Sequence, residues 1–169
     1  MKYQIRKWKI EDASELAYTI NDLYVQNNLT DGIPYPYTVE DGKEYIKEML
    51  SSSPENIFTY AIIVDNHVVG SISVKRMDNI YRCTAEIGYY IGKDYWGNSI
   101  ICEALKQICQ YVFEHTDIVR IFVAPFAFNY ASCRVLEKSG FHFEGVLRNN
   151  GYKNGKIYDM RMYSLIKEN

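Results

Sequence analysis

The most informative stretch of this sequence runs from a predicted strand through a glycine-bearing loop into a predicted helix. The strand ends in Glu86-Ile87-Gly88-Tyr89-Tyr90-Ile91, the loop spans residues 92–99, and the helix starts at Ile100. The first turn of a helix has backbone N–H groups without partners and carries partial positive charge, so such a loop suits an anion such as a pyrophosphate. It matches neither GxGxxG nor GxxxxGK[ST], and a plain strand, turn and helix without a ligand remains the alternative.

A second block with residues that could do chemistry, residues 129–141, also lies between two predicted strands. Asn129 and Ser132 are three residues apart, so a helix places them on one face. Asn129 is a suitable cap for that helix, and Ser132 offers a hydroxyl on the same face. In the first block, Glu86 is a candidate general base, with a structural ion pair as the alternative.

Composition excludes several classes of protein. The 169 residues carry 19 Lys+Arg and 21 Asp+Glu, and this net charge of −2 gives no electrostatic case for nucleic acid binding. The length predicts a single domain over residues 1–169. No apolar run approaches the roughly 20 residues that span a membrane, and no signal-peptide pattern opens the chain, so we expect a cytoplasmic protein. The 4 cysteines show no metal-binding spacing, so we expect no metal.

The elements that must position the two blocks alternate between strands and helices. Thr38, with Asp41 three residues on, is a good helix N-cap, and Gly140 is a typical residue just after a helix. Periodicity predicts strands over residues 3–8, 57–64, 68–75, 83–91, 119–124, 141–147 and 156–166, and helices over 11–27, 38–50, 100–114 and 129–139. This order predicts a mixed α/β fold around one sheet.

Together, these blocks resemble the GNAT N-acetyltransferase superfamily, and within it the RimJ/RimL-like branch of ribosomal-protein acetyltransferases. The resemblance covers nearly the whole chain, in the family's order, through these blocks: Arg6-x-Trp8, Pro34-Tyr35-Pro36-Tyr37, Glu86-Ile87-Gly88-Tyr89, Tyr95-Trp96-Gly97, Asn129-x-x-Ser132-x-x-Val135-Leu136-Glu137-Lys138-x-Gly140-Phe141 and Gly155-Lys156-x-Tyr158-Asp159. It implies an α/β (α+β) GNAT-like domain with a mixed, mostly antiparallel central sheet, splayed in the middle and flanked by about four helices.

The resemblance also implies acetyl-CoA as co-substrate, lying between the strand that ends at Ile91 and the short strand at 119–124. Its pantetheine would pair with the backbone of Tyr89, Tyr90 and Ile91. Asn129 would hydrogen-bond cofactor amide groups, with a helix cap as the alternative, and Ser132 would lie near the sulfur, with a plain surface hydroxyl as the alternative. Its pyrophosphate would rest on the backbone amides of Trp96, Gly97, Asn98, Ser99, Ile100 and Ile101. Ser99 stands where the family has glycine and Ile101 where it often has a small residue. The Ser99 side chain restricts the approach of a phosphate but adds a hydroxyl donor, so retained and weakened binding both remain open.

The implied reaction is direct transfer of acetyl from the thioester to a primary amine. Glu86 would act as base through water, and Ser132 as acid, with Tyr130 as a weaker rival. Trp8, Tyr35 and Tyr37 would wall the acceptor cleft, with core packing as the alternative. The 16 tyrosines suit such an aromatic-lined cleft.

The expected acceptor is a protein N-terminal α-amino group. The alternatives are a small amine or aminoglycoside-like compound, or a CoA-binding module that has lost catalysis. Monomer and homodimer both remain open.

Overall fold

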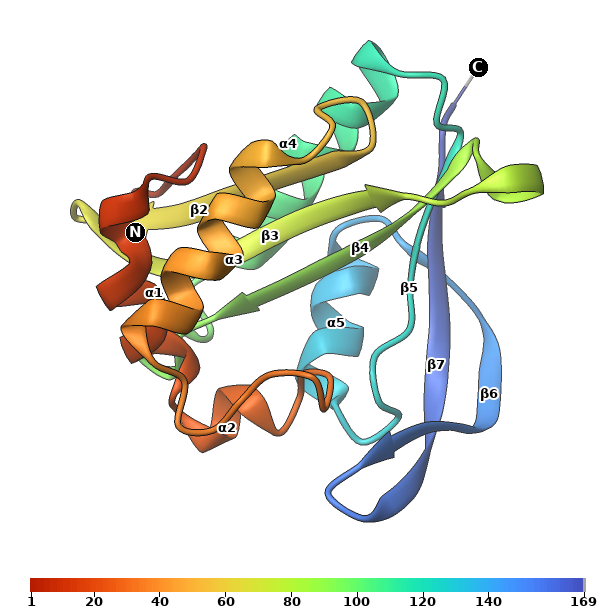
Figure 1. Ribbon diagram of the computed structural model, residues 1–169. Coiled ribbons are helices and arrows are strands. Elements are labelled where there is room, and N and C mark those ends of the chain that lie inside the picture. The colour runs from red at the N-terminus through yellow and green to blue at the C-terminus, as the bar shows by residue number, and fades with distance from the viewer. Residues whose placement is uncertain (169) are drawn as a thin grey trace.

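Seven strands form one sheet in the computed structural model, which describes residues 1–168 (Figure 1). Their order is β1-β2-β3-β4-β5-β7-β6, and every neighbouring pair is antiparallel except the parallel pair β4 and β5. The strands are β1 (Gln4–Arg6), β2 (Ile57–Val64), β3 (His67–Arg76), β4 (Thr84–Ile91), β5 (Arg120–Val123), β6 (His142–Lys153) and β7 (Lys156–Ile166). The predicted mixed, mostly antiparallel α/β fold is confirmed.

Helices cover both faces of the sheet and form a separate core on each (Figure 1). The helices are α1 (Ala13–Ile20), α2 (Leu23–Gln26), α3 (Val39–Ser51), α4 (Ile100–His115) and α5 (Tyr130–Lys138), with 3-10 turns at Ile10–Asp12, Asn79–Tyr81 and Lys93–Tyr95. Helices α4 and α5 bury the first core, around Ile87, Leu105 and Leu136. Helices α1 and α3 bury the second core, around Leu16 and Ile46.

The first strand is shorter than expected, Gln4–Arg6 rather than 3–8. The two larger departures from the expected boundaries each have a local reason. The helix expected from residue 11 to 27 is interrupted after Ile20, because the Asp22 side chain accepts a hydrogen bond from Tyr24 N at 2.7 Å and caps α2 as a new helix. The described residues therefore hold five α-helices rather than about four. Strand β6 extends to Lys153 rather than to Leu147, because bulges keep it paired with β7 as far as Asn154-Gly155. Both of these residues have positive φ, 51° and 78°, as a two-residue hairpin turn requires.

No helix in residues 1–168 is long and apolar enough to cross a membrane. Nor does this part of the chain gather three or more His, Cys, Asp or Glu side chains in a group that could hold a metal ion.

Strands β4 and β5 pair over only three residues and then part. The pairs run from Thr84↔Arg120 to Glu86↔Phe122, while β4 continues alone to Ile91. We call the point where they separate, after Glu86 and Phe122, the fork. The predicted splay of the sheet is therefore present, and it lies between the two strands that the sequence indicated.

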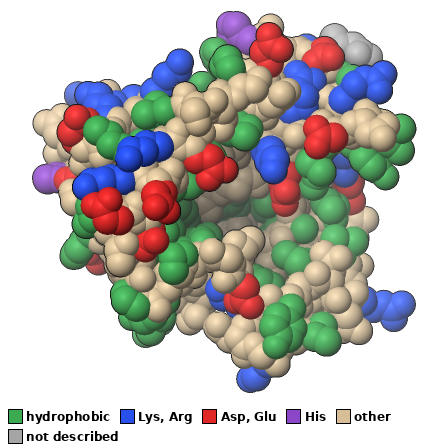
Figure 2. All heavy atoms as spheres, in the orientation of Figure 1, with side chains coloured by type: hydrophobic (Ala, Val, Ile, Leu, Met, Phe, Trp, Pro, Cys, Tyr) green, Lys and Arg blue, Asp and Glu red, His purple; other side chains and the backbone are tan. Residues whose placement is uncertain are grey.

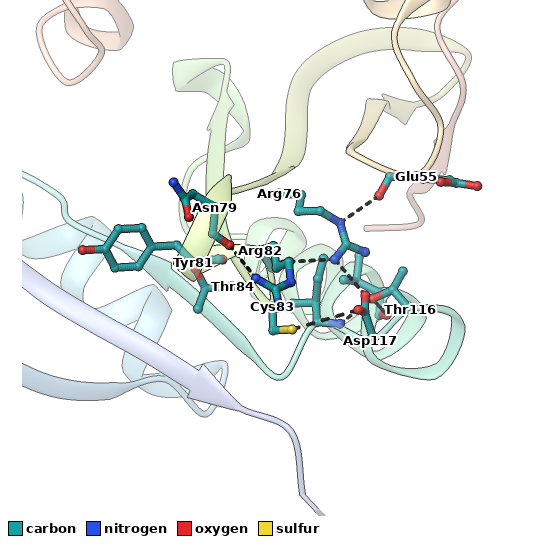
Figure 3. Close-up of polar contacts among 11 residues, drawn as sticks. Glu55, Arg76, Asn79, Tyr81, Arg82, Cys83, Thr84, Thr116 and Asp117 are labelled. Atoms are coloured by element: carbon teal, nitrogen blue, oxygen red, sulfur yellow. Dashed lines mark hydrogen bonds and ion pairs between the residues drawn. The ribbon is translucent and has the colours of Figure 1, made fainter.

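A single arginine ties together the segments at the closed end of the fork (Figure 3). Arg76, the last residue of β3, donates to Asp117 Oδ1 and to the Arg82 carbonyl, both at 2.7 Å, and to the Glu55 carbonyl at 3.2 Å. These partners precede β5, β4 and β2 respectively. The side chain of Arg76 thus fixes where β4 and β5 begin, and so where they start to pair.

A second ion pair braces the strands on the far side of the fork. Arg120 on β5 makes two hydrogen bonds of 2.6 Å with Glu144 on β6, and the Ser164 hydroxyl of β7 donates to the same carboxylate at 2.6 Å. The hydrogen bonds from Arg120 and Ser164 lower the pKa of Glu144 from 4.5 to about 2. The carboxylate therefore holds three strands together while it stays ionised.

We predict that Glu144→Gln removes an acid-dependent part of the stability. A carboxyl group whose pKa is lower in the folded chain stabilises the fold above its unfolded-state pKa, and this contribution is lost as the pH falls towards the folded-state value. For Glu144 that window runs from about pH 4.5 down to about pH 2. Urea unfolding should show the largest difference between wild type and variant at neutral pH, with the two converging near the acid end.

Glu48→Gln is the matched control, since Glu48 is exposed and makes no ion pair among the described residues. A difference between wild type and Glu144→Gln that stays constant through the acid window would contradict the prediction.

Candidate active site

The edge of β4 that faces β5 carries unpaired backbone groups beyond the fork. Along a strand, backbone groups point alternately to the two sides. Gly92 N donates to Val69 O on the β3 side at 2.8 Å, whereas Cys83 O accepts from Val119 N on the β5 side at 2.9 Å. The alternation therefore directs into the gap the backbone N–H and C=O groups of Ile87 and Tyr89 and the N–H of Ile91, whose carbonyl is taken by the Trp96 indole. An extended, amide-bearing ligand can pair with them as an added strand would.

Tyr90 differs from its two neighbours. By the same alternation its backbone groups face β3, with Ser71 opposite. Its side chain packs against the second core, where its hydroxyl is buried with no hydrogen-bond partner in the described structure. Burial raises the pKa of this hydroxyl well above its usual value. Of the three residues expected to pair with a cofactor, Tyr89 and Ile91 offer backbone groups to the gap.

The loop after β4 holds its shape through two residues in left-handed backbone conformations. Gly97 has φ of 79° and Ser99 has φ of 60°, a region that costs a residue with a Cβ about 1–2 kcal/mol. The Trp96 indole N–H donates to the Ile91 carbonyl at 3.0 Å and so fastens the loop to the end of β4. Asn98 binds the carbonyls of Tyr95 and Trp96 and stays within the loop.

The amides that start α4 point out of the helix end, beside the end of β4. The first bond of the helix is Glu103 N to Ser99 O at 3.1 Å, so the N–H groups of Ile100 and Ile101 have no partner in their own helix. Both isoleucine side chains are buried in the first core. Ile101, which replaces a small residue, therefore projects away from the helix end, and only its backbone is offered to an anion.

The side chain of Ser132 contacts the side chain of Tyr89, a pairing that the sequence did not indicate. Its hydroxyl lies 2.7 Å from the Tyr89 hydroxyl, and its backbone N–H donates to Asn129 Oδ1 at 3.1 Å. Asn129 is thus the N-cap of α5, as one reading proposed. Burial raises the pKa of Tyr89, so its hydroxyl stays protonated at neutral pH. No local signal could have paired Tyr89 with a residue 43 positions away.

Glu86 lies on the opposite face of β4 from Tyr89, at the fork itself. The strand alternates, so Glu86 and Tyr90 share the face covered by α1 and α3, and Tyr89 faces α5. Glu86 is exposed, and it makes no ion pair within the described residues although Lys75 lies opposite on β3. The candidate base and the candidate acid therefore approach the gap from its two sides.

The three expected acceptor-wall residues divide between core and surface. Trp8 is 3% exposed and Tyr37 is 9% exposed, and both belong to the second core. Burial raises the pKa of Tyr37 to about 12. Tyr35 is 57% exposed, so it alone of the three presents most of its ring to a partner. Tyr130, the rival acid, is 69% exposed at the start of α5.

The surface on the Glu86 face is hollowed below β4, between α3 and the β5–β7 half of the sheet (Figure 2). The hollow lies over the gap between β4 and β5. A ligand in the gap is therefore accessible to a second molecule on this face.

Comparison with known proteins decides the family. Residues 3–142 match the family described as "Acetyltransferase (GNAT) domain". This chain is a GNAT acetyltransferase. It is 30% identical over 168 residues to the "Probable N-acetyltransferase YjcK" of Bacillus subtilis, covering 96% of this chain and 92% of that protein. It is 36% identical over 106 residues to the "Putative ribosomal N-acetyltransferase YdaF" of the same species, covering 63% of this chain and 57% of that protein.

A solved structure has the same fold. "RimL- Ribosomal L7/L12 alpha-N-protein acetyltransferase in complex with Coenzyme A" superimposes on the acetyltransferase with a TM-score of 0.88 and 23% identity, covering 98% of this chain and 94% of that one. The RimJ/RimL-like resemblance and the N-acetyltransferase class predicted from the sequence are confirmed.

We predict that Ser99→Gly stabilises the acetyltransferase by up to about 1 kcal/mol, because glycine adopts positive φ without the Cβ clash, less its own entropic cost. The variant should also bind acetyl-CoA more tightly, since removing the side chain lets the backbone approach a phosphate. Thermal unfolding and calorimetry measure the two effects.

Ser99→Ala is the control that keeps the Cβ and removes the hydroxyl. It should be no more stable than wild type and bind no tighter. Weaker acetyl-CoA binding by Ser99→Gly would instead mean that the Ser99 hydroxyl is itself a phosphate ligand.

Proposed function

We propose that this enzyme transfers the acetyl group of acetyl-CoA directly to a primary amine, and that the amine is the N-terminal α-amino group of a protein. The observation that carries the proposal is the fork. It leaves one edge of β4 unpaired and leads that edge into the open amides of α4. Acetyl-CoA supplies the activated acetyl group as a thioester.

The chain has groups suited to each part of the co-substrate. The backbone of Tyr89 and Ile91 would pair with the pantetheine amides. The backbone amides from Gly97 to Ile101 would bind the pyrophosphate, helped by the partial positive charge of the α4 N-terminus. The Trp96 N–H, also expected there, instead donates to the Lys93 carbonyl at 3.1 Å. The side-chain NH₂ of Asn129 makes no hydrogen bond in the described structure, because the cap uses Oδ1, so it is available to a pantetheine carbonyl.

Glu86 is suited to accept the proton that the amine loses. A protein α-amino group has a pKa of about 8, against about 10.4 for lysine, so only a mild base is needed near neutral pH. The exposed carboxylate at the fork could act through one water molecule, which leaves room for acceptors of different size. The amine nitrogen then forms the new bond to the acetyl carbon.

The Tyr89–Ser132 pair is suited to stabilise the sulfur of CoA as it leaves. As the bond from acetyl carbon to sulfur breaks, negative charge grows on sulfur, and a hydroxyl that donates a hydrogen bond or a proton stabilises it. The hydroxyls lie 2.7 Å apart, so one can donate to the other while the second donates into the gap. Tyr89 would thus share the role of acid that was expected of Ser132 alone.

The burial of Cys133 favours direct transfer over a mechanism in which a cysteine is first acetylated. Cys133, next to Ser132, is 4% exposed and part of the first core. A buried thiol without a histidine base nearby is a poor nucleophile.

The choice of a protein α-amine rests on two named relatives, a putative ribosomal N-acetyltransferase and a ribosomal L7/L12 α-N-protein acetyltransferase. A small amine acceptor and a CoA-binding module without catalysis are the outcomes to be distinguished. The cytoplasmic location and the choice between monomer and homodimer stay predictions.

The test combines calorimetry with acetyl-CoA and mass spectrometry of peptides that have a free or a blocked N-terminus. We expect saturable acetyl-CoA binding, and acetyl transfer only to free α-amines. Binding without transfer to any amine would support the module that has lost catalysis, and no binding at all would end the enzyme proposal.

We predict that Glu86→Gln lowers kcat/KM by about 10²-fold near neutral pH, the usual scale for losing a general base. Acetyl-CoA affinity should not change, which serves as the internal control. The loss should shrink as the pH rises, because the α-amine then deprotonates without help. An unchanged rate across the pH range would remove Glu86 as the base.

We predict that Tyr89→Phe and Ser132→Ala each lower kcat while acetyl-CoA affinity changes little. Because the hydroxyls act as one unit, the double variant should be about as slow as the worse single variant. Losses that multiply in the double variant would show two independent roles instead, and an unchanged kcat in Ser132→Ala would exclude it as acid.

A further inference from the structure

Lys153 occupies an unusual position for a lysine, at the buried end of β6. The Asn154-Gly155 turn follows it directly, and its register partner across the hairpin is Lys156. Only 8% of its side chain is exposed. A buried ammonium group needs polar partners, and Lys153 Nζ finds them in Thr30 O at 3.3 Å and Asp31 Oδ1 at 3.4 Å.

These partners belong to the segment between α2 and α3. We call residues 27–37 of this segment the strap. Next to Lys153, Asn154 Nδ2 also donates to Asn27 Oδ1 of the strap at 3.2 Å. The side chains of Lys153 and Asn154 therefore attach the tip of the β6–β7 hairpin to a segment more than 120 residues earlier in the sequence.

The other end of the strap is attached to α1. Asn21 Nδ2 donates to the Tyr37 carbonyl, and Tyr37 N donates to Asn21 Oδ1, both at 2.7 Å. Gln26 Nε2 donates to the Pro34 carbonyl at 3.1 Å. Thr19 of α1 in turn donates to the Val68 carbonyl of β3 at 3.3 Å.

These contacts complete a closed ring. It runs from β4 to β5, through β7 to the hairpin tip, across Lys153 to the strap, and back through α1 and β3 to β4. The strap ends at Tyr37 in the second core, so the ring closes on the Glu86 face of the fork. In Figure 1 the strap and the hairpin tip lie together below the open end of the fork, and in Figure 2 the hollow lies above them.

We propose that Lys153 is a positioning residue for the amine acceptor, because it is the charged contact that closes this ring and holds the strap, with its exposed Tyr35, beside the fork. The proposal rests on the proposed function, since it assumes that the amine reaches Glu86 from this face. Among the described residues, the Lys153 side chain makes its polar contacts with Thr30 and Asp31, and none with Glu86, Tyr89 or Ser132. Its loss should therefore affect the acceptor and spare the co-substrate.

The experiment measures acceptor KM, kcat and acetyl-CoA Kd in four variants. Lys153→Met keeps the apolar stem and removes the charge, Asp31→Asn removes the counter-charge, and Lys153→Arg restores the charge. Lys156→Met is the matched control, an exposed lysine across the same turn with no ion pair among the residues described.

We expect Lys153→Met to raise the KM for a peptide α-amine by about fivefold or more, with kcat and acetyl-CoA Kd within about twofold of wild type. Asp31→Asn should show a smaller rise, Lys153→Arg should recover most of the loss, and Lys156→Met should show none. Amide hydrogen exchange over residues 27–37 should be faster in Lys153→Met than in Lys156→Met, because the strap has lost one attachment.

An acceptor KM that stays at the wild-type value in Lys153→Met overturns the proposal, whether or not exchange in the strap becomes faster. An equal weakening of acetyl-CoA binding also overturns it, since that would mark a general structural role. Failure of the proposed function is distinguishable, because it would appear in the wild-type protein itself as absence of transfer to any peptide α-amine.

Discussion

The short pairing of β4 with β5 is the constraint on which the site depends. Backbone N–H and C=O groups in a folded protein need hydrogen-bond partners, and a sheet normally supplies them along its whole length. Here the hydrogen-bonded pairing of β4 with β5 stops at Glu86↔Phe122, while β4 continues to Ile91. Water can satisfy the remaining groups, and so can an extended ligand that pairs with β4 without closing the sheet. A ligand site in the gap requires the fork to stay open at a fixed place. Arg76 fixes its closed end, and Glu144 braces the strands on its far side.

The alternation of side chains along β4 then divides the chemistry between two faces. Tyr89 points towards α5 and meets Ser132, whereas Glu86 points to the face covered by α1 and α3. A single strand can thus bring the proposed base and the proposed hydroxyl donor to one gap from its two opposite faces. The price in stability is an edge without partners, and the Trp96 indole offsets part of it by binding the Ile91 carbonyl.

Features set by neighbours in sequence could be predicted, and features set by distant neighbours could not. Thr38 and Asp41 form the predicted cap of α3, and the loop into α4 lies where its glycine and polar residues indicated. The interruption at Asp22 was missed, because the apolar spacing of α1 and α2 continues across it. Trp8 and Tyr37 show the limit more clearly: aromatic residues near polar ones suit a cleft wall and a core equally well, and only the packing of α1, α3 and β2 decides. The Tyr89–Ser132 and Lys153–Thr30 contacts join residues 43 and 123 positions apart, beyond any local pattern.

The positions of Tyr89 and Tyr90 follow from the same geometry. A gap in a sheet has walls that are core on one side and binding site on the other, so a suitable residue needs an apolar body and a polar tip. Tyr89 meets both needs, since its ring packs against the first core and its hydroxyl reaches Ser132. Phenylalanine would fill the same space but would leave no donor at the gap, and serine alone would leave a void beneath it. Tyr90 has the same combination of apolar ring and polar tip on the other face of β4, where its buried hydroxyl has no protein partner in residues 1–168. A buried hydroxyl without a partner lowers stability, so the packing of the Tyr90 ring in the second core has to outweigh that cost.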